Sequence, residues 1–159
     1  MSQLKFKIEQ VALCPKDPER AIKLLSEMGA GEWAHDVVVA AGPVFGAPGT
    51  NVANLAFDYE LLKGANELEV LHYRAGRNWM GGLYPSVSHL GMHCAAEELQ
   101  RWKAFFKQRG IDIAQEVKTE SHSNPAIAGK RWYHYCIFDT RDILGVDIKF
   151  IVRKDNAPE

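Results

Sequence analysis

Polar side chains that could do chemistry recur on two pairs of short segments, each with the alternating pattern of a β-strand. One pair is 8–14 and 87–93, and the other is 67–70 and 147–152. Because successive side chains of a strand point to opposite faces, the polar residues of each segment share one face. That face would carry Gln10, Glu67, Glu69, His89, His93, Asp147 and Lys149. A ligand cavity between two matched strand pairs needs such a set, and the alternative is a solvated sheet face.

The four-residue spacing of His89 and His93 would match a two-histidine zinc motif only on a helix. The segment has the pattern of a strand, so this motif is discounted. His93 is either a residue that lines the cavity or a hydrogen-bonded histidine of an ordinary sheet. The sequence contains neither a glycine-rich phosphate loop nor a nucleophile elbow.

The elements that must position these side chains occur twice. The strand at 8–14 precedes a helix predicted over 18–28, with Asp17 as its N-cap, and the strand at 87–93 precedes a helix predicted over 97–108. Gln10 lies 79 residues before His89, and Leu68 lies 80 residues before Ile148. This nearly constant offset indicates an internal repeat.

Three strand-like segments follow each predicted helix. They are 33–41, 52–61 and 67–73 in the first half, and 113–120, 131–138 and 146–153 in the second. We therefore predict an α+β fold of two tandem βαβββ modules, which form a curved mixed sheet around a central cleft, with the helices on the outer face. We expect one domain over 1–159, with module one at 5–74, a linker at 75–85 and module two at 86–154.

The composition is that of an ordinary soluble globular protein, with 47% hydrophobic and 25% charged residues. The net charge of −1 indicates neither nucleic acid nor an anionic membrane as a partner. No apolar run approaches the roughly 18 residues of a membrane-spanning helix, and residues 1–7 lack a secretory pattern. Three cysteines without a CxxC motif favour a reduced, cytoplasmic setting.

Two segments in this repeat plan, IEQVALC at 8–14 and VSHLGMHC at 87–94, resemble the glyoxalase, bleomycin-resistance and extradiol-dioxygenase superfamily, the vicinal oxygen chelate proteins. The segment RWYHYCIFDTRDILGVDIKF at 131–150 is similar to the closing hairpin of that superfamily. The resemblance extends from about Phe6 to Arg153. It implies a small-molecule substrate or ligand, and it allows a homodimer.

The resemblance also implies a metal site, because the first and fourth strands of each module provide the ligands in such families. The corresponding positions are Gln10, Glu69, His89 and Lys149. The first three are similar to the glyoxalase I set, and their amide, carboxylate and imidazole groups suit zinc, nickel, manganese or iron. The implied activity is a metal-dependent lyase or isomerase that acts on a small oxygen-rich molecule and stabilises an enolate.

Lys149 departs from this pattern, which has a glutamate at the fourth position. An ammonium group has no lone pair to offer a metal. Asp147 could supply the missing carboxylate, Lys149 could stabilise a substrate oxyanion beside a three-ligand metal, or Lys149 could pair with Glu67 or Glu69 in place of the metal. Glu67, Asp147 and Lys149 are therefore the catalytic candidates.

Tyr133 and His134, with His93, are the candidates for substrate contact, although aromatic residues are common in ordinary strands. Two other functions stay open. One is a metal-free ligand-binding protein of the bleomycin-resistance kind. The other is an iron-dependent ring-cleaving dioxygenase, which Gln10 at a histidine position disfavours.

Overall fold

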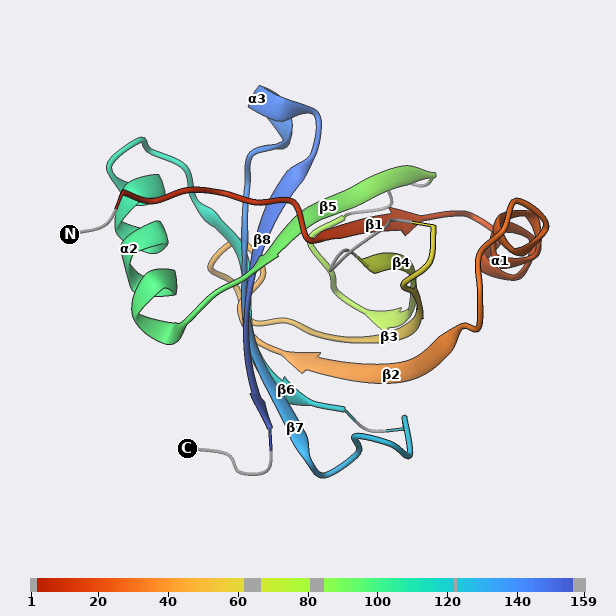
Figure 1. The fold of residues 1–159 in the computed structure, drawn as a ribbon. Helices are drawn as coiled ribbons and strands as arrows, with labels where there is room; N and C mark the ends of the chain where they lie inside the picture. The colour runs from red at the N-terminus through yellow and green to blue at the C-terminus, as the bar shows by residue number, and fades with distance from the viewer. Residues whose placement is uncertain (1–2, 62–66, 81–84, 122, 156–159) are drawn as a thin grey trace.

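The structure is a computed structural model, and it describes residues 3–61, 67–80, 85–121 and 123–155. Within these residues the strands form one eight-stranded sheet in the order β2-β3-β4-β1-β5-β8-β7-β6 (Figure 1). Module one contains β1 (Gln10–Cys14), α1 (Pro18–Glu27), β2 (Ala34–Ala41), β3 (Thr50–Asp58) and β4 (Glu67–Gly76). Module two contains β5 (Ser86–His93), α2 (Ala96–Lys107), β6 (Ile113–Glu120), β7 (Arg131–Phe138), α3 (Arg141–Leu144) and β8 (Asp147–Asp155).

The two long helices begin near the predicted positions but differ in how they are held. Asp17 caps α1, since its carboxylate accepts a hydrogen bond from the backbone N–H of Arg20 at 3.0 Å. No described residue of α1 is buried. By contrast, α2 buries an apolar stripe, and Trp102 stacks on Phe150 of β8 with ring centroids 4.8 Å apart. Figure 1 places the two helices at opposite ends of the molecule, outside the sheet.

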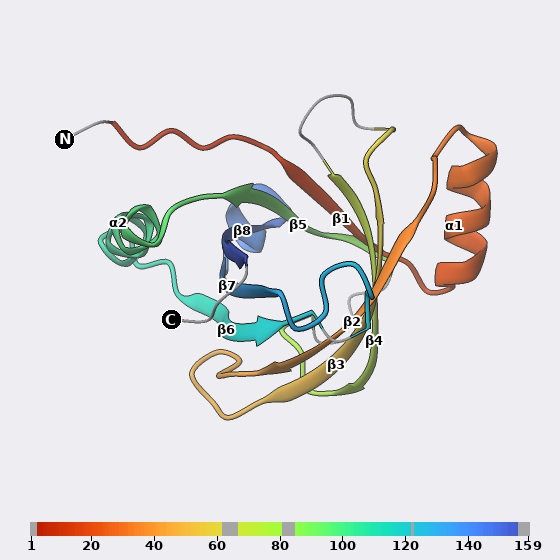
Figure 2. The ribbon, with the colours of Figure 1, turned by 60° about the horizontal axis from the view of Figure 1, so that its bottom comes forward.

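Pairing at the centre of the sheet joins the two modules. Strand β1 pairs in parallel with β4, β5 pairs in parallel with β8, and β1 and β5 pair antiparallel with each other. The sheet curves until its edge strands β2 and β6 approach each other, as Figure 2 shows. The hydroxyl group of Thr119 donates a hydrogen bond to the backbone oxygen of Val39 across this gap, at 2.9 Å. The predicted α+β fold with a curved mixed sheet is thus confirmed.

A buried carboxylate reinforces the near-closure of the sheet. Asp36 of β2 is 6% exposed, and it accepts hydrogen bonds from three residues that follow β6. The donors are the hydroxyl of Ser121, the backbone N–H and hydroxyl of Ser123 at 3.0 and 3.1 Å, and the backbone N–H of Asn124 at 3.2 Å. We call these four residues the Asp36 clasp. It ties the loop between β6 and β7 to the opposite module.

The observed elements differ from the predicted ones mainly at their ends. Strand β4 continues to Gly76, two residues into the segment predicted as a linker, and α3 is a short helix that was not predicted. Residues 81–84 of the predicted linker lie outside the described residues, so the module boundaries stay a prediction. Among the described residues, no helix combines the length and apolar character that crossing a membrane requires.

Candidate functional site

The curved sheet encloses a cavity of about 680 Å³ that residues of both modules line. This volume lies in the range of small-molecule binding sites. The cavity wall includes Gln10, Glu67, Glu69, His89, His93, Tyr133 and Lys149. The structure therefore brings most of the sequence-predicted site residues to one concave surface.

The strand register explains how residues so far apart in sequence meet. Across β4, β1, β5 and β8, one row of side-by-side positions is Glu67, Gln10, Gly91 and Lys149, and the next is Glu69, Ala12, His89 and Asp147. At the centre of each row a large residue lies beside a small one, Gln10 beside Gly91 and His89 beside Ala12. A Cβ atom at Gly91 would lie only 3.0 Å from Cβ and from Oε1 of Gln10. The glycine therefore leaves the space that the Gln10 side chain occupies.

Three polar groups converge on one nitrogen atom at the base of the cavity. Oε1 of Gln10 lies 2.7 Å from Nε2 of His89, Oε2 of Glu69 lies 3.3 Å from it, and Nζ of Lys149 lies 3.4 Å from it. Gln10, Glu69 and His89 are each at most 2% exposed. Burial of so many polar atoms is costly unless each finds a partner or a cation.

The His89 ring is held in a neutral state. Burial, followed by the positive charge of Lys149, lowers the pKa of His89 to about 4. The hydroxyl of Ser88 lies 3.1 Å from Nδ1. If Nδ1 donates to this hydroxyl, the lone pair of Nε2 is free for an ion; if Nδ1 accepts from it, Nε2–H donates to Oε1 of Gln10. The side-chain amide of Gln10 in turn donates a hydrogen bond to Glu67.

The pKa values of the two glutamates of β4 are shifted in opposite directions. Burial raises the pKa of Glu67, and the nearby charge of Glu69 raises it further. Burial alone would also raise the pKa of Glu69, but Lys149 and His89 more than offset this, so that its pKa lies below the ordinary value. Two neighbouring carboxylates with divergent pKa values suit different roles, one as a charged ligand and one as a proton acceptor.

The donor set of Gln10, Glu69 and His89 fits a divalent metal in type and in spacing. Metal bonds of about 2.0–2.2 Å place neighbouring ligand atoms roughly 3 Å apart, close to the observed 2.7 and 3.3 Å. Oε2 of Glu69 is buried and makes no hydrogen bond to the described residues, as expected of an atom that faces a cation. Nζ of Lys149 lies 3.4 Å from Nε2 of His89, and its ammonium group has no lone pair to offer a metal.

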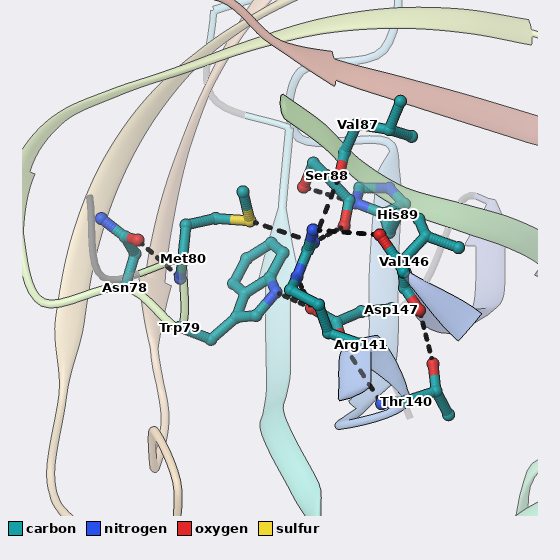
Figure 3. Close-up of polar contacts among 11 residues, drawn as sticks. Asn78, Trp79, Met80, Val87, Ser88, His89, Thr140, Arg141, Val146 and Asp147 are labelled. Atoms are coloured by element: carbon teal, nitrogen blue, oxygen red, sulfur yellow. Dashed lines mark hydrogen bonds and ion pairs between the residues drawn. The ribbon is translucent and has the colours of Figure 1, made fainter. Parts of the chain in front are cut away.

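Asp147 does not line the cavity, and Figure 3 shows the polar contacts that hold its carboxylate. Its carboxylate accepts hydrogen bonds from Nε1 of Trp79, the backbone N–H of Thr140 and Nε of Arg141, each at 3.2 Å. Arg141 also donates to the backbone oxygen of Ser88 at 2.7 Å. These hydrogen bonds disfavour Asp147 as a replacement ligand or free base, and its role stays a prediction. Asp147 anchors Trp79 and Arg141 behind His89. The ring centroids of Trp79 and His89 lie 6.1 Å apart.

The predicted substrate contacts separate onto two faces of the sheet. Tyr133 and His93 line the cavity, and Nδ1 of His93 lies 3.7 Å from a carboxylate oxygen of Glu9. His134 points to the other face, where its Nε2 lies 2.8 Å from the carboxylate of Glu116. Neighbours on a strand alternate, and His134 does not line this cavity, although it and Tyr133 both line a second groove. Its role in substrate contact stays a prediction.

Sequence reasoning missed several residues of the cavity. Arg131 and Tyr135 flank Tyr133 on the same face of β7, and Arg153 follows Lys149 by four residues on the same face of β8. The two-residue alternation that located Lys149 could also have located Arg131 and Arg153. Asp36 gave no such signal, because its partners other than Val37 lie 85 to 88 residues away.

Comparisons with known proteins identify the fold. No family model matches the sequence, and no curated protein matches it. Among solved structures, the methylmalonyl-CoA epimerase of Mycobacterium tuberculosis is 12% identical, with a TM-score of 0.54 over 98% of this chain and 94% of its own. A hypothetical protein of Bacillus halodurans is 11% identical, with a TM-score of 0.55 over 96% of this chain and 98% of its own.

A third similar structure is methylmalonyl-CoA epimerase of Streptomyces coelicolor in complex with 2-nitronate-propionyl-CoA. It is 9% identical, with a TM-score of 0.51 over 96% of this chain and 98% of its own. Identities this low carry information on the fold alone. The chain has the vicinal oxygen chelate fold, which the glyoxalase and bleomycin-resistance proteins share.

Proposed function

We propose that the chain is a glyoxalase-like isomerase or lyase that moves a proton at a carbon beside a carbonyl group in a small oxygen-rich molecule. The observation that carries this proposal is the convergence of Gln10, Glu69 and Lys149 on Nε2 of His89 at the base of the cavity. A carbon acid of this kind needs positive charge near its carbonyl oxygen and a base near its proton. The methylmalonyl-CoA epimerases of the same fold act on such a compound, which supports this reaction class.

Gln10, Glu69 and His89 would hold a divalent metal, one of zinc, nickel, manganese or iron, which would stabilise negative charge on a substrate oxygen. Lys149 would approach the same oxygen from the β8 side and add a second positive charge. Glu67 would take the proton, because its raised pKa makes it a stronger base and its carboxylate faces the cavity. The amide of Gln10 would orient Glu67 through their hydrogen bond.

The proposal is tested by hydrogen exchange in D₂O. Purified protein, loaded with each metal in turn, is incubated with 2-oxo acids, 2-hydroxy ketones and thioesters, and exchange of the hydrogen beside the carbonyl is followed by NMR. We expect exchange above the rate of free metal, and a loss of about 100-fold or more in Glu67→Gln. Glu19→Gln is the matched control, since Glu19 lies exposed on α1. Equal exchange in the two variants would contradict the role of Glu67.

A second candidate function is a metal-free binding protein, and one specific observation favours it. Ser88, His89, Gln10 and Glu67 form a continuous hydrogen-bonded chain that needs no metal. Calorimetric titration with zinc, nickel and manganese separates the two functions. Binding of about one ion per chain, lost in His89→Ala, supports the metal-dependent enzyme. No binding in either protein supports the binding protein, with Lys149 in the place of the metal.

A further inference from the structure

We infer that the cavity has a second subsite, around Arg131 and Arg153, that binds an anionic oxygen group of the substrate, either a carboxylate or a phosphate. The inference rests on the proposed function, because it places the reacting carbon beside Lys149 and Glu67 in the same cavity. It adds a substrate class: carbonyl compounds that carry a second, remote acidic group.

The charges of the cavity wall are divided between the two modules. Among the described residues, the acidic side chains of the wall all come from module one, namely Glu9, Asp36, Glu67 and Glu69. The basic side chains all come from module two, namely Arg131, Lys149 and Arg153. A ligand in this cavity therefore lies between an acidic wall from module one and a basic wall from module two. Its anionic oxygen atoms are stabilised only along the wall that β7 and β8 form.

Strand geometry places the positive charges at two depths of the cavity. Lys149, Ile151 and Arg153 point to the same side of β8, so Lys149 and Arg153 lie about 13 Å apart along the strand. Arg153 is paired with Tyr133 of β7, and Arg131 lies two residues before Tyr133 on the same face. The side chain of Arg153 is 46% exposed and that of Arg131 is 25% exposed. These two arginines thus form the outer end of the cationic wall, and Lys149 forms the inner end.

The two arginines share a single carboxylate partner. Nε of Arg131 lies 2.6 Å from Oδ1 of Asp155, and Nη2 of Arg153 lies 3.6 Å from Oδ2 of the same residue. Among the described residues, Asp155 is the one carboxylate within ion-pair distance of these two guanidinium groups, and Glu67 acts on Arg153 from farther away. The side chain of Asp155 is 41% exposed, and ion pairs this open to solvent are weak. An incoming carboxylate or phosphate can therefore bind to the guanidinium edges, which match its geometry.

The test compares matched probes that differ only in the remote acidic group. The first pair is 2-oxoadipate and 2-oxohexanoate, and the second is dihydroxyacetone phosphate and dihydroxyacetone. Binding to the full-length protein is measured by calorimetry. We expect the more acidic member of at least one pair to bind about tenfold or more tightly, as for a charge-assisted hydrogen bond to arginine. The pair that shows the preference identifies a carboxylate or a phosphate as the bound group.

Variants assign this preference to the subsite. We expect Arg153→Gln to abolish it, and Lys154→Gln to preserve it, because Lys154 is the next residue on β8 and lines a groove on the other face. Asp155→Asn removes the competing carboxylate and should strengthen binding of the acidic member alone. Circular dichroism verifies that each variant is folded.

Three results would overturn the subsite: no preference in either pair, no binding of any probe, or a preference that survives Arg153→Gln combined with Arg131→Gln. These results differ from a failure of the proposed function, which would appear as absent hydrogen exchange with the binding preference intact.

Discussion

Replacement of Asp36 by asparagine should destabilise the protein by about 2–4 kcal/mol at pH 7. The carboxylate accepts hydrogen bonds from five donors, four in the clasp loop and the backbone N–H of Val37 at 2.8 Å. A hydrogen bond to a charged group contributes about 1.5–3 kcal/mol, against about 0.5–1.5 kcal/mol for a neutral one. Asparagine keeps most of the geometry and loses the charge. The difference is roughly 1 kcal/mol for each donor, and the contributions are less than additive.

The pH dependence of this loss distinguishes a charge effect from a packing effect. Burial alone would raise the pKa of Asp36, but the hydrogen bonds from Ser121, Ser123 and Val37 bring it below 3.8. A carboxyl group whose pKa is lower in the folded state stabilises that state above its unfolded pKa. Its contribution is lost as the pH falls through the folded pKa. The difference between wild type and Asp36→Asn should therefore be constant above pH 5 and should shrink below about pH 4.

Urea denaturation at 25 °C, followed by tryptophan fluorescence at pH 7 and at pH 3, measures this difference directly. A loss of 2–4 kcal/mol corresponds to a decrease in Tm of roughly 5–15 °C for a chain of this length. Asp142→Asn, at an exposed position in α3, is the control for removal of a negative charge. Equal stability of wild type and Asp36→Asn at pH 7 would refute the role of the clasp. So would a loss of the same size at both pH values.

Three other changes test the geometry of the site. Gly91→Ala places a Cβ 3.0 Å from Gln10, so it should lower the free energy of unfolding by about 1–3 kcal/mol and weaken metal binding. Denaturation and calorimetry measure the two effects. Unchanged metal affinity would contradict the crowding of Gln10. Lys149→Glu removes an ammonium group and adds a carboxylate, so it should strengthen divalent-metal binding at least tenfold (about 1.4 kcal/mol), and weaker binding would argue against a metal at this position. The pKa of His89 is about 4 in the folded state and 6.5 in the unfolded state, so only the unfolded state takes up a proton as the pH falls from 7 to 5. The free energy of unfolding should therefore decrease by about 2 kcal/mol over this range. In His89→Gln this part of the pH dependence should vanish, and its persistence in urea denaturation would assign it to another group.

Alternation along strands is a local property of the chain. Together with the internal repeat and the superfamily resemblance, it predicted the fold and placed Gln10, Glu69, His89 and Lys149 on one surface. The functional roles of these residues stay predictions. The same alternation, applied to β7, should have separated Tyr133 from His134. Asp147 could not be assigned from the sequence, since its partners Trp79 and Arg141 come from a linker and from the short helix α3. The Asp36 clasp depends on side-chain contacts between distant segments, and no periodic pattern marks these.

The hydrogen bonds that hold Asp147 have a consequence for the stereochemistry of the proposed reaction. In the register of the sheet, Glu67 lies beside Gln10 of β1 as Asp147 lies beside His89 of β5, so the two carboxylates occupy equivalent places in the two modules. Glu67 faces the cavity, while Trp79, Thr140 and Arg141 hold Asp147 away from it. Of these two carboxylates, only Glu67 would then be available as a base to a planar enolate bound between the modules, and it would act from one side of the enolate plane. Proton removal and return from a single side preserve the configuration of a stereogenic carbon, and deuterium from the solvent would enter only one of two prochiral positions.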